Sequence, residues 1–128
     1  MSAEIFGSRQ AREIVEYVRD RYGDELEFLW ERFPKDAVWR NQKSRKWYGL
    51  MMTISRRKLG FDTDEEVEII DLRFLKNEAR DFAASNEGIL PGYHMNKNNW
   101  ITIVLDGSVE TGKILELLDQ SYEIALGK

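Results

Sequence analysis

The only histidine of the chain, His94, lies in its densest cluster of polar and aromatic residues, PGYHMNKNNW at positions 91–100. A histidine beside a lysine could supply an acid or base and a cation, in a catalytic site or in a small-ligand pocket around Tyr93, His94 and Lys97. The spacing provides no nucleophile and no partner carboxylate. The same residues also fit a structured turn, in which His94 and Asn96 would satisfy backbone groups.

Basic residues form a second cluster that could bind a ligand. Between residues 35 and 58 there are eight basic side chains and one acidic side chain, a net charge of +7. The flanking segments 1–34 and 59–128 carry −3 and −8, so the total is −4. The basic residues gather at two predicted strand turns, near positions 40–46 and 56–58.

Such turns could contact the phosphates of a nucleic acid, because Lys and Arg replace the counterions condensed there. Aromatic residues interleave with the first turn, and Trp47 and Tyr48 are secondary candidates for stacking. The alternative is a pair of ordinary solvated turns, neutralised by the acidic residues between Asp62 and Glu68. The predicted phosphate contacts are Arg40, Lys43, Arg45, Lys46, Arg56, Arg57 and Lys58.

The segment GSVETGK at positions 107–113 matches the first seven positions of a phosphate-binding loop. That motif continues with Ser or Thr, which binds magnesium, whereas this chain has Ile114. Glu110 would also place a negative charge inside a loop that must hold phosphate. The segment is therefore predicted to be a helix start, with Ser108 or Thr111 as a possible cap.

The composition excludes several classes of site. The 128 residues contain no cysteine, so there is no disulfide, no thiolate nucleophile and no cysteine-based zinc or iron–sulfur site. One histidine argues against a multi-histidine metal site. We therefore expect no catalytic residue, no metal and no cofactor. The sequence pI of about 5.1 also counts against strong nucleic-acid binding, which favours a basic domain.

Length and terminal composition predict one domain, residues 1–128, in the cytoplasm. The N-terminus has no basic start and no apolar run of signal-peptide length. The longest uncharged, mainly apolar stretch covers nine residues, 47–55, which is too short for a membrane span. The absence of cysteine fits a reducing compartment.

Periodicity predicts the elements that position these residues. A helix is expected from Ser8, a good cap, to Gly23. Segment 26–30 fits either a short strand or irregular chain, and segment 88–99 fits irregular chain or a short strand plus turn. The remaining predictions are strands at 37–41, 46–56, 67–74 and 100–105 and helices at 76–85 and 110–126. Short connections favour an α+β fold with two layers, an antiparallel sheet and helices on one face.

The second face of this sheet is too apolar for a wetted surface. Alternation predicts that Tyr48, Leu50, Met52 and Ile54 share one face of their strand, and that Trp47, Met51 and Thr53 share the other. The second face would then carry Trp47, Met51, Ile69, Trp100 and Val104. Either loops or the N-terminal segment shield it, or it binds a partner or a second copy of the chain.

Several motifs together resemble one protein family. They are FPKDAVWRNQKSRKWYGLMM, VEIIDLRF and PGYHMNKNNWITIVLDGSV, the last followed by a helix that contains LLDQSYEIA. In this combination the chain resembles the MmcQ/YjbR family from about Ser8 to Tyr122. The resemblance implies a compact α-β(3)-α-β(2)-α fold, similar in shape to secretion chaperones and to frataxin-like CyaY proteins.

Members of that family are described as DNA-binding through a double-winged arrangement, and here the wings would be the two basic turns. The family implies no metal, nucleotide or catalytic residue. The residues carried over by resemblance are Arg40, Lys46, Trp47, Tyr93, His94, Met95, Asn96, Lys97 and Trp100.

Together these observations predict a non-enzymatic domain that contacts DNA through phosphates and reads no base sequence. The alternative is a protein-interaction or homodimerisation module that uses the apolar sheet face around Trp47 and Trp100. No membrane partner is expected.

Overall fold

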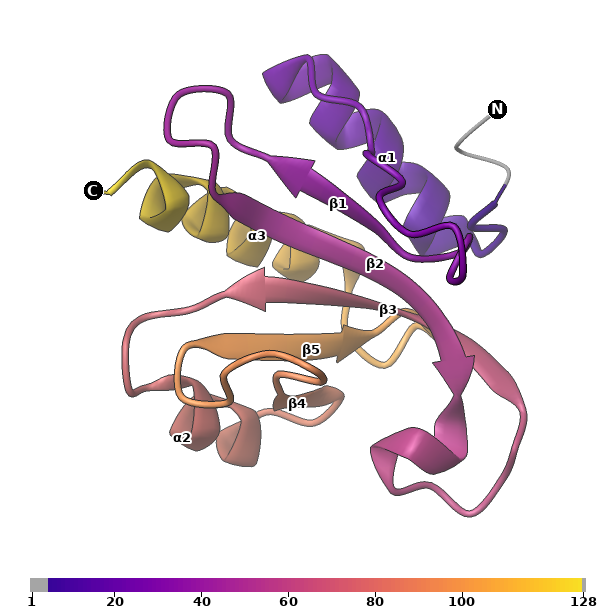
Figure 1. The fold of residues 1–128 in the computed structure, drawn as a ribbon. Helices are drawn as coiled ribbons and strands as arrows, with labels where there is room; N and C mark the ends of the chain where they lie inside the picture. Colours follow the sequence, from indigo (N-terminus) through magenta and orange to yellow (C-terminus); the bar gives the residue numbers. More distant parts are fainter. Residues whose placement is uncertain (1–4, 128) are drawn as a thin grey trace.

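The computed structural model describes residues 5–127 (Figure 1). Within them the chain forms, in order, α1 (Arg9–Tyr22), β1 (Ala37–Arg40), β2 (Trp47–Ser55), the 3-10 helix η2 (Arg56–Leu59), β3 (Glu66–Arg73), α2 (Ala79–Ser85), β4 (Ile89–Pro91), β5 (Trp100–Val104) and α3 (Thr111–Leu126). The predicted α+β class and the order α-β(3)-α-β(2)-α are confirmed.

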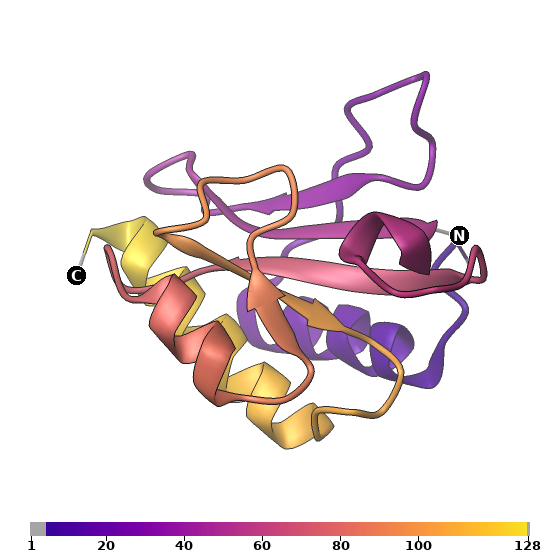
Figure 2. The same ribbon diagram turned by 90° about the horizontal axis from the view of Figure 1, so that it is seen from below.

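The strands form one antiparallel sheet in the order β1-β2-β3-β5-β4. After β3 the chain passes through α2, forms the short edge strand β4, and returns as β5 between β3 and β4. The helices lie together on one side of the sheet, which we call the helix-covered face (Figure 2). We call the opposite side the second face.

The ends of α1 follow local capping chemistry. The Oγ of Ser8 accepts a hydrogen bond from the N–H of Ala11 at 3.1 Å, and the helix ends at Gly23 with φ of 70°. A residue with a Cβ would be strained at that φ, so glycine stops the helix there. This confirms the predicted bounds.

Other elements begin or end at residues that differ from the prediction, and each difference has a local cause. The second helix begins at Ala79, not at residue 76, because Asn77 has a φ of 65° that helical backbone does not adopt. The N-cap of α3 is Glu110, without a side-chain hydrogen bond, so neither Ser108 nor Thr111 is the cap. Ser108 instead donates to Asp106. Segment 26–30 contributes one isolated bridge, between Glu27 and Val38.

Each face of the sheet has its own apolar core. On the helix-covered face, alternate residues of β3 and β5 such as Ile70, Leu72, Ile101 and Ile103 pack against the helices. On the second face the smaller cluster comprises Val38, Leu50, Met52, Ile54, Val67, Ile69 and Val104. The predicted placement of Ile69 and Val104 on the second face is therefore confirmed.

In β2 the predicted faces are wrong for Leu50, Met51, Met52 and Ile54. Trp39 pairs with Gly49 and Arg40 pairs with Trp47, so Tyr48 is an extra residue in β2. Such a bulge changes which face the following side chains occupy. Tyr48 and Met51 consequently both belong to the helix-covered core, while Leu50 and Met52 lie on the second face.

Loops cover the second face. Trp30, from the segment before β1, packs on its core, as do Tyr93 and Met95, from the loop between β4 and β5. Both segments rise above the sheet on the side away from the helices (Figure 2). Trp100 is only 5% exposed. Of the two readings of this face, the structure supports shielding by loops.

Candidate functional site

The first basic turn, residues 41–46, is built around the buried side chain of Asn41. Its Oδ1 accepts the N–H groups of Lys43 at 2.9 Å and Ser44 at 3.0 Å. Its own N–H donates to the carbonyl of Lys46 at 2.8 Å. Short polar side chains satisfy the backbone in this way, so the Asn41 side chain holds the turn from within.

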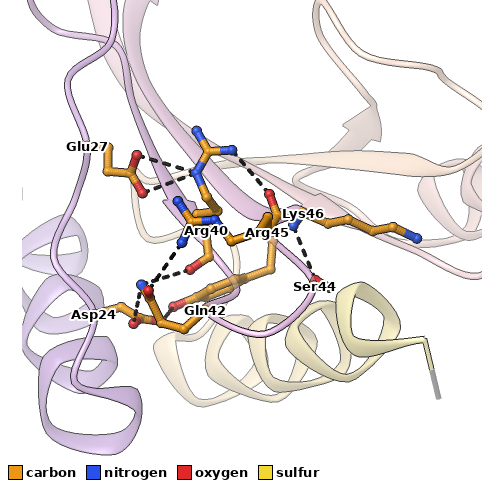
Figure 3. A network of polar contacts seen from close by, with 8 residues as sticks. Asp24, Glu27, Arg40, Gln42, Ser44, Arg45 and Lys46 are labelled. Carbon is orange, nitrogen blue, oxygen red and sulfur yellow. Dashed lines mark hydrogen bonds and ion pairs between the residues drawn. The ribbon is translucent and has the colours of Figure 1, made fainter.

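The cations of this turn differ in their partners. Arg40 is paired with Glu27 at 3.3 Å and donates to the carbonyl of Arg45 at 3.1 Å (Figure 3). Among residues 5–127, no ion pair involves Lys43, Arg45 or Lys46, and all three are exposed. The turn therefore presents three uncompensated positive charges to solvent.

The second basic turn, in η2, is largely neutralised. Arg57 lies 2.7 Å from Asp64 and 3.7 Å from Asp62. Arg56 lies 3.4 Å from both Glu65 and Asp106. These pairs are mostly exposed, so each adds little to stability, but together they cancel the charge. Lys58 is the cation of this turn that forms no ion pair within the described chain.

The structure does not bring the two turns together. They lie at opposite ends of β2 (Figure 1). With a rise of roughly 3.3 Å per residue, the length of β2 separates them by about 26 Å. Any joint contact with a duplex would have to span that distance.

The aromatic residues beside the first turn are not free for stacking in the way predicted. Tyr48 is fully buried, because the bulge turns it toward the helices. Its hydroxyl donates to the buried carboxylate of Asp24 at 2.5 Å, and burial raises its pKa. Trp47 is half-buried against the second-face core.

The loop between β4 and β5 holds the predicted family motif in a turn. The N–H of Gly92 donates to the carbonyl of Trp100 at 2.9 Å, and the ammonium of Lys97 donates to the carbonyl of Gly92 at 3.0 Å. The Oδ1 of Asn96 accepts the N–H of Asn98 at 2.9 Å. The turn prediction is thus confirmed for Asn96. His94 has a φ of 62° and its ring lies 4.1 Å from that of Tyr93.

A buried carboxyl group lies beneath this loop and was not predicted as a site residue. Asp71, in β3, is fully buried, and its Oδ1 accepts from the hydroxyl of Thr102 at 2.5 Å. Thr102 in turn accepts the N–H of Tyr93 at 2.7 Å. The Oδ2 of Asp71 has no hydrogen-bond partner within the described chain. Burial raises the pKa of Asp71 to about 8. The available signal was an Asp placed directly between the apolar residues Ile70 and Leu72 of the strand.

Two residues after Asp71 in β3, the half-buried Arg73 contacts both β2 and β5. The Nε of Arg73 donates to the carbonyl of Trp47, and its guanidinium carbon lies 4.8 Å from the ring centre of Trp100. Burial lowers the pKa of Arg73. The two tryptophans of the predicted motif are therefore connected through Arg73.

Between the two covering loops lies a cavity of about 260 Å³, which we call the Asp36 hollow. It is open on the second face, and its lining brings His94 together with residues from the segment before β1. A second hollow of about 260 Å³ adjoins it and includes Tyr93 and Lys58. The Asp36 hollow is lined by Trp30, Phe33, Asp36, Trp47, Leu50, Met52, His94 and Met95.

The predicted pocket around Tyr93, His94 and Lys97 is thus divided. His94 lines the Asp36 hollow, whereas Lys97 is turned toward the carbonyl of Gly92. The participation of Asp36 was not predicted, because it lies 58 positions before His94 in the sequence. Among residues 5–127, no group of three or more His, Cys, Asp or Glu is placed to hold a metal ion.

Comparison of the sequence with known protein families shows which family the chain is related to. A family model described as YjbR matches residues 13–124. The chain belongs to the YjbR family. The predicted resemblance is therefore confirmed over nearly the whole chain.

Relatives of this YjbR protein are known in several bacteria. The uncharacterized protein YyaQ of Bacillus subtilis (strain 168) is 38% identical over 112 residues, which cover 88% of this chain and 94% of YyaQ. A crystal structure of a Pseudomonas syringae protein is 34% identical, with a TM-score of 0.84, over 89% of this chain and 97% of that one. A Deinococcus radiodurans protein, at 22% identity and a TM-score of 0.66 over 91% and 78% of the two chains, shares the fold.

None of the helices within residues 5–127 has the length and apolar character needed to cross a membrane.

Proposed function

We propose that this protein is a cytoplasmic, non-enzymatic domain that binds nucleic-acid phosphates through the β1–β2 turn. The supporting observation is that Lys43, Arg45 and Lys46 project from a well-held turn without an acidic partner in the described chain. Cations in that state release condensed counterions when they meet phosphates. Base reading is not part of the proposal.

The proposed binding surface is smaller than the two wings predicted from the sequence. The ion pairs of Arg56 and Arg57 must break before either side chain can serve a phosphate, so η2 contributes mainly Lys58. Arg40 is likewise engaged with Glu27. Binding is consequently expected to be weak, within the range of non-specific complexes.

Titration of duplex DNA across salt concentrations tests the proposal. Three phosphate contacts predict that log K falls with log salt with a slope of about −2.7. The double charge reversal Lys43→Glu and Lys46→Glu should weaken binding about tenfold at low salt and make the slope less steep by about 2. The matched control reverses Lys76 and Lys113, which are also exposed but lie outside the turn.

Absence of binding at low salt would refute the proposal. So would equal losses from the turn variant and the control variant, because that result would mean that net charge, and not this turn, controls affinity.

A protein contact is a second candidate, and the structure changes its location. The sheet face around Trp47 and Trp100 is covered, whereas the segment before β1 exposes Phe28, Leu29 and Phe33 by 37%, 45% and 59%. Adjacent exposed apolar side chains favour association. We propose that a homodimer would form through this segment.

Light scattering after size exclusion, over a range of protein concentrations, measures the association. A dimer that disappears in Leu29→Ser is the expected result. A strict monomer at every concentration would rule out the homodimer.

A further inference from the structure

The Asp36 hollow combines a carboxylate with aromatic walls. Its two indoles, Trp30 and Trp47, meet edge to face with ring centres 5.7 Å apart and an interplanar angle of 86°. Phe33 stands at the rim with 59% of its surface exposed. Met52 and Met95 supply polarizable sulfur to the remaining lining. Trp30, Phe33 and Met95 belong to the two loops that cover the second face, whereas Trp47 and Met52 belong to β2 beneath them.

The carboxylate of Asp36 has no hydrogen bond or ion pair within the described chain. Its backbone N–H donates to the carbonyl of Phe33 at 3.0 Å, which fixes the turn that leads into β1. The side chain is half-buried and lines both hollows. Burial raises its pKa, and Coulomb interactions with His94 and Lys58 oppose that effect. A carboxylate in such a place is poorly solvated, and a bound cation would offset the cost.

The residues that line the Asp36 hollow favour an organic cation over a metal ion. One carboxylate among aromatic and thioether groups is a poor ligand set for Mg²⁺ or Ca²⁺, which require several oxygen ligands. Indole faces attract cations of low charge density, and aromatic enclosures of this kind suit quaternary ammonium groups. The volume of about 260 Å³ lies below the range of drug-sized sites, so the occupant is small.

We propose that the Asp36 hollow binds a small organic cation that carries a trialkylammonium group, with its charge facing Asp36 and its methyl groups against Trp30 and Trp47. This site is separate from the cations of the β1–β2 turn, so the inference does not rest on the proposed contact with phosphates. The occupant is a free small molecule.

Choline is the probe, and 3,3-dimethyl-1-butanol is its uncharged counterpart of nearly the same shape. Binding is measured by tryptophan fluorescence and by the indole N–H resonances in NMR spectra. The resonances of Trp30 and Trp47, assigned with the variants Trp30→Phe and Trp47→Phe, should move on saturation. That of the fully buried Trp39 should stay in place. The alcohol should bind about tenfold more weakly than choline, since it lacks the charge.

Two variants separate charge from shape. Asp36→Asn should weaken choline binding about tenfold and leave the affinity for the alcohol unchanged. The matched control is Glu31→Gln, an exposed acid of the same segment that does not line the hollow, and it should bind choline like the wild type. Trp30→Leu, which retains Asp36, should weaken binding of both choline and the alcohol. This variant tests the site if Asp36→Asn does not fold.

Three outcomes would overturn the inference. They are no saturable binding of choline, equal affinity for choline and the alcohol, and equal choline affinity of the wild type and Asp36→Asn. The second outcome would mark the hollow as simply apolar. The third would place the cation elsewhere on the protein.

Discussion

Replacing Asp71 by Asn is expected to make the protein more stable than the wild type at mildly alkaline pH. Asp71 is fully buried, and burial raises its pKa from 3.8 to about 8. In the unfolded chain the same carboxyl group ionises near its ordinary value. Between these two values the folded protein holds a proton that the unfolded chain releases, so the stability of the wild type must fall as pH rises.

The sign and size of the effect follow from this difference. The contribution of Asp71 to the free energy of unfolding is fully present below pH 3.8 and is lost as the pH rises through about 8. Each pKa unit corresponds to about 1.36 kcal/mol, which sets a ceiling of about 6 kcal/mol for the loss. The amide of the variant carries no charge at any of these pH values, so its free energy of unfolding should lack this slope. At acidic pH it should be less stable than the wild type by about 1 kcal/mol, because its NH₂ group gains no partner at the position of Oδ2.

Urea denaturation of both proteins across pH measures the prediction. Glu87→Gln is the control, because Glu87 is exposed and forms no ion pair within the described chain. Its stability should follow that of the wild type at every pH. Parallel curves for the wild type and Asp71→Asn would contradict the prediction.

Ionisation of Asp71 should also affect the position of the loop that carries His94. The carboxyl group bonds Thr102, which accepts the N–H of Tyr93 at 2.7 Å. Tyr93 directly precedes His94, which lines the Asp36 hollow. The chain of hydrogen bonds therefore connects a buried proton site in β3 with the mouth of a surface cavity.

The elements of the fold could be predicted because their signals are local. Ser8 and Gly23 bound α1 through capping geometry that involves only neighbouring residues. Alternation in β3 and β5 identified the core face, because both strands are regular. The alternation failed in β2, where the bulge at Tyr48 depends on pairing with β1 and on the close approach of Trp39 to Gly49. Neither contact is visible in the residues of β2 alone.

Contacts of the site were predictable only where their residues lie close together in the sequence. Neutralisation of Arg57 by Asp62 and Asp64 was anticipated, because these residues flank a single turn. Pairing of Arg40 with Glu27 requires the isolated bridge between Glu27 and Val38, which no periodicity predicts. The meeting of Asp36 with His94 likewise depends on the folding of two loops over one sheet face.

Substitution of Gly92 by Ala is expected to be the most damaging single methyl addition in the loop that bears the family motif. A Cβ at this position would lie 2.7 Å from the Cβ of Trp100, 3.1 Å from its carbonyl oxygen and 3.3 Å from the Cβ of Met95. Two of these atoms lie next to the backbone and one belongs to it, so none can swing aside as the end of a flexible side chain does.

The strain must be relieved by moving the loop away from β5. That movement would lengthen the hydrogen bond from the N–H of Gly92 to the carbonyl of Trp100, now 2.9 Å, and displace the carbonyl that anchors Lys97. Overpacking costs about 1–3 kcal/mol and a lost hydrogen bond about 1 kcal/mol, so we expect a loss of about 2–4 kcal/mol in the free energy of unfolding.

Gly112→Ala is the matched control for this substitution. Gly112 lies in the first turn of α3, and a Cβ there meets nothing within 4 Å. Alanine in a helix is preferred over glycine by up to about 1 kcal/mol, so this variant should be neutral or more stable. Chemical denaturation of both variants gives the comparison, and equal stabilities would refute the close approach of the loop to β5. Because Met95 lines the Asp36 hollow, Gly92→Ala should also weaken choline binding, whereas Gly112→Ala should leave it unchanged.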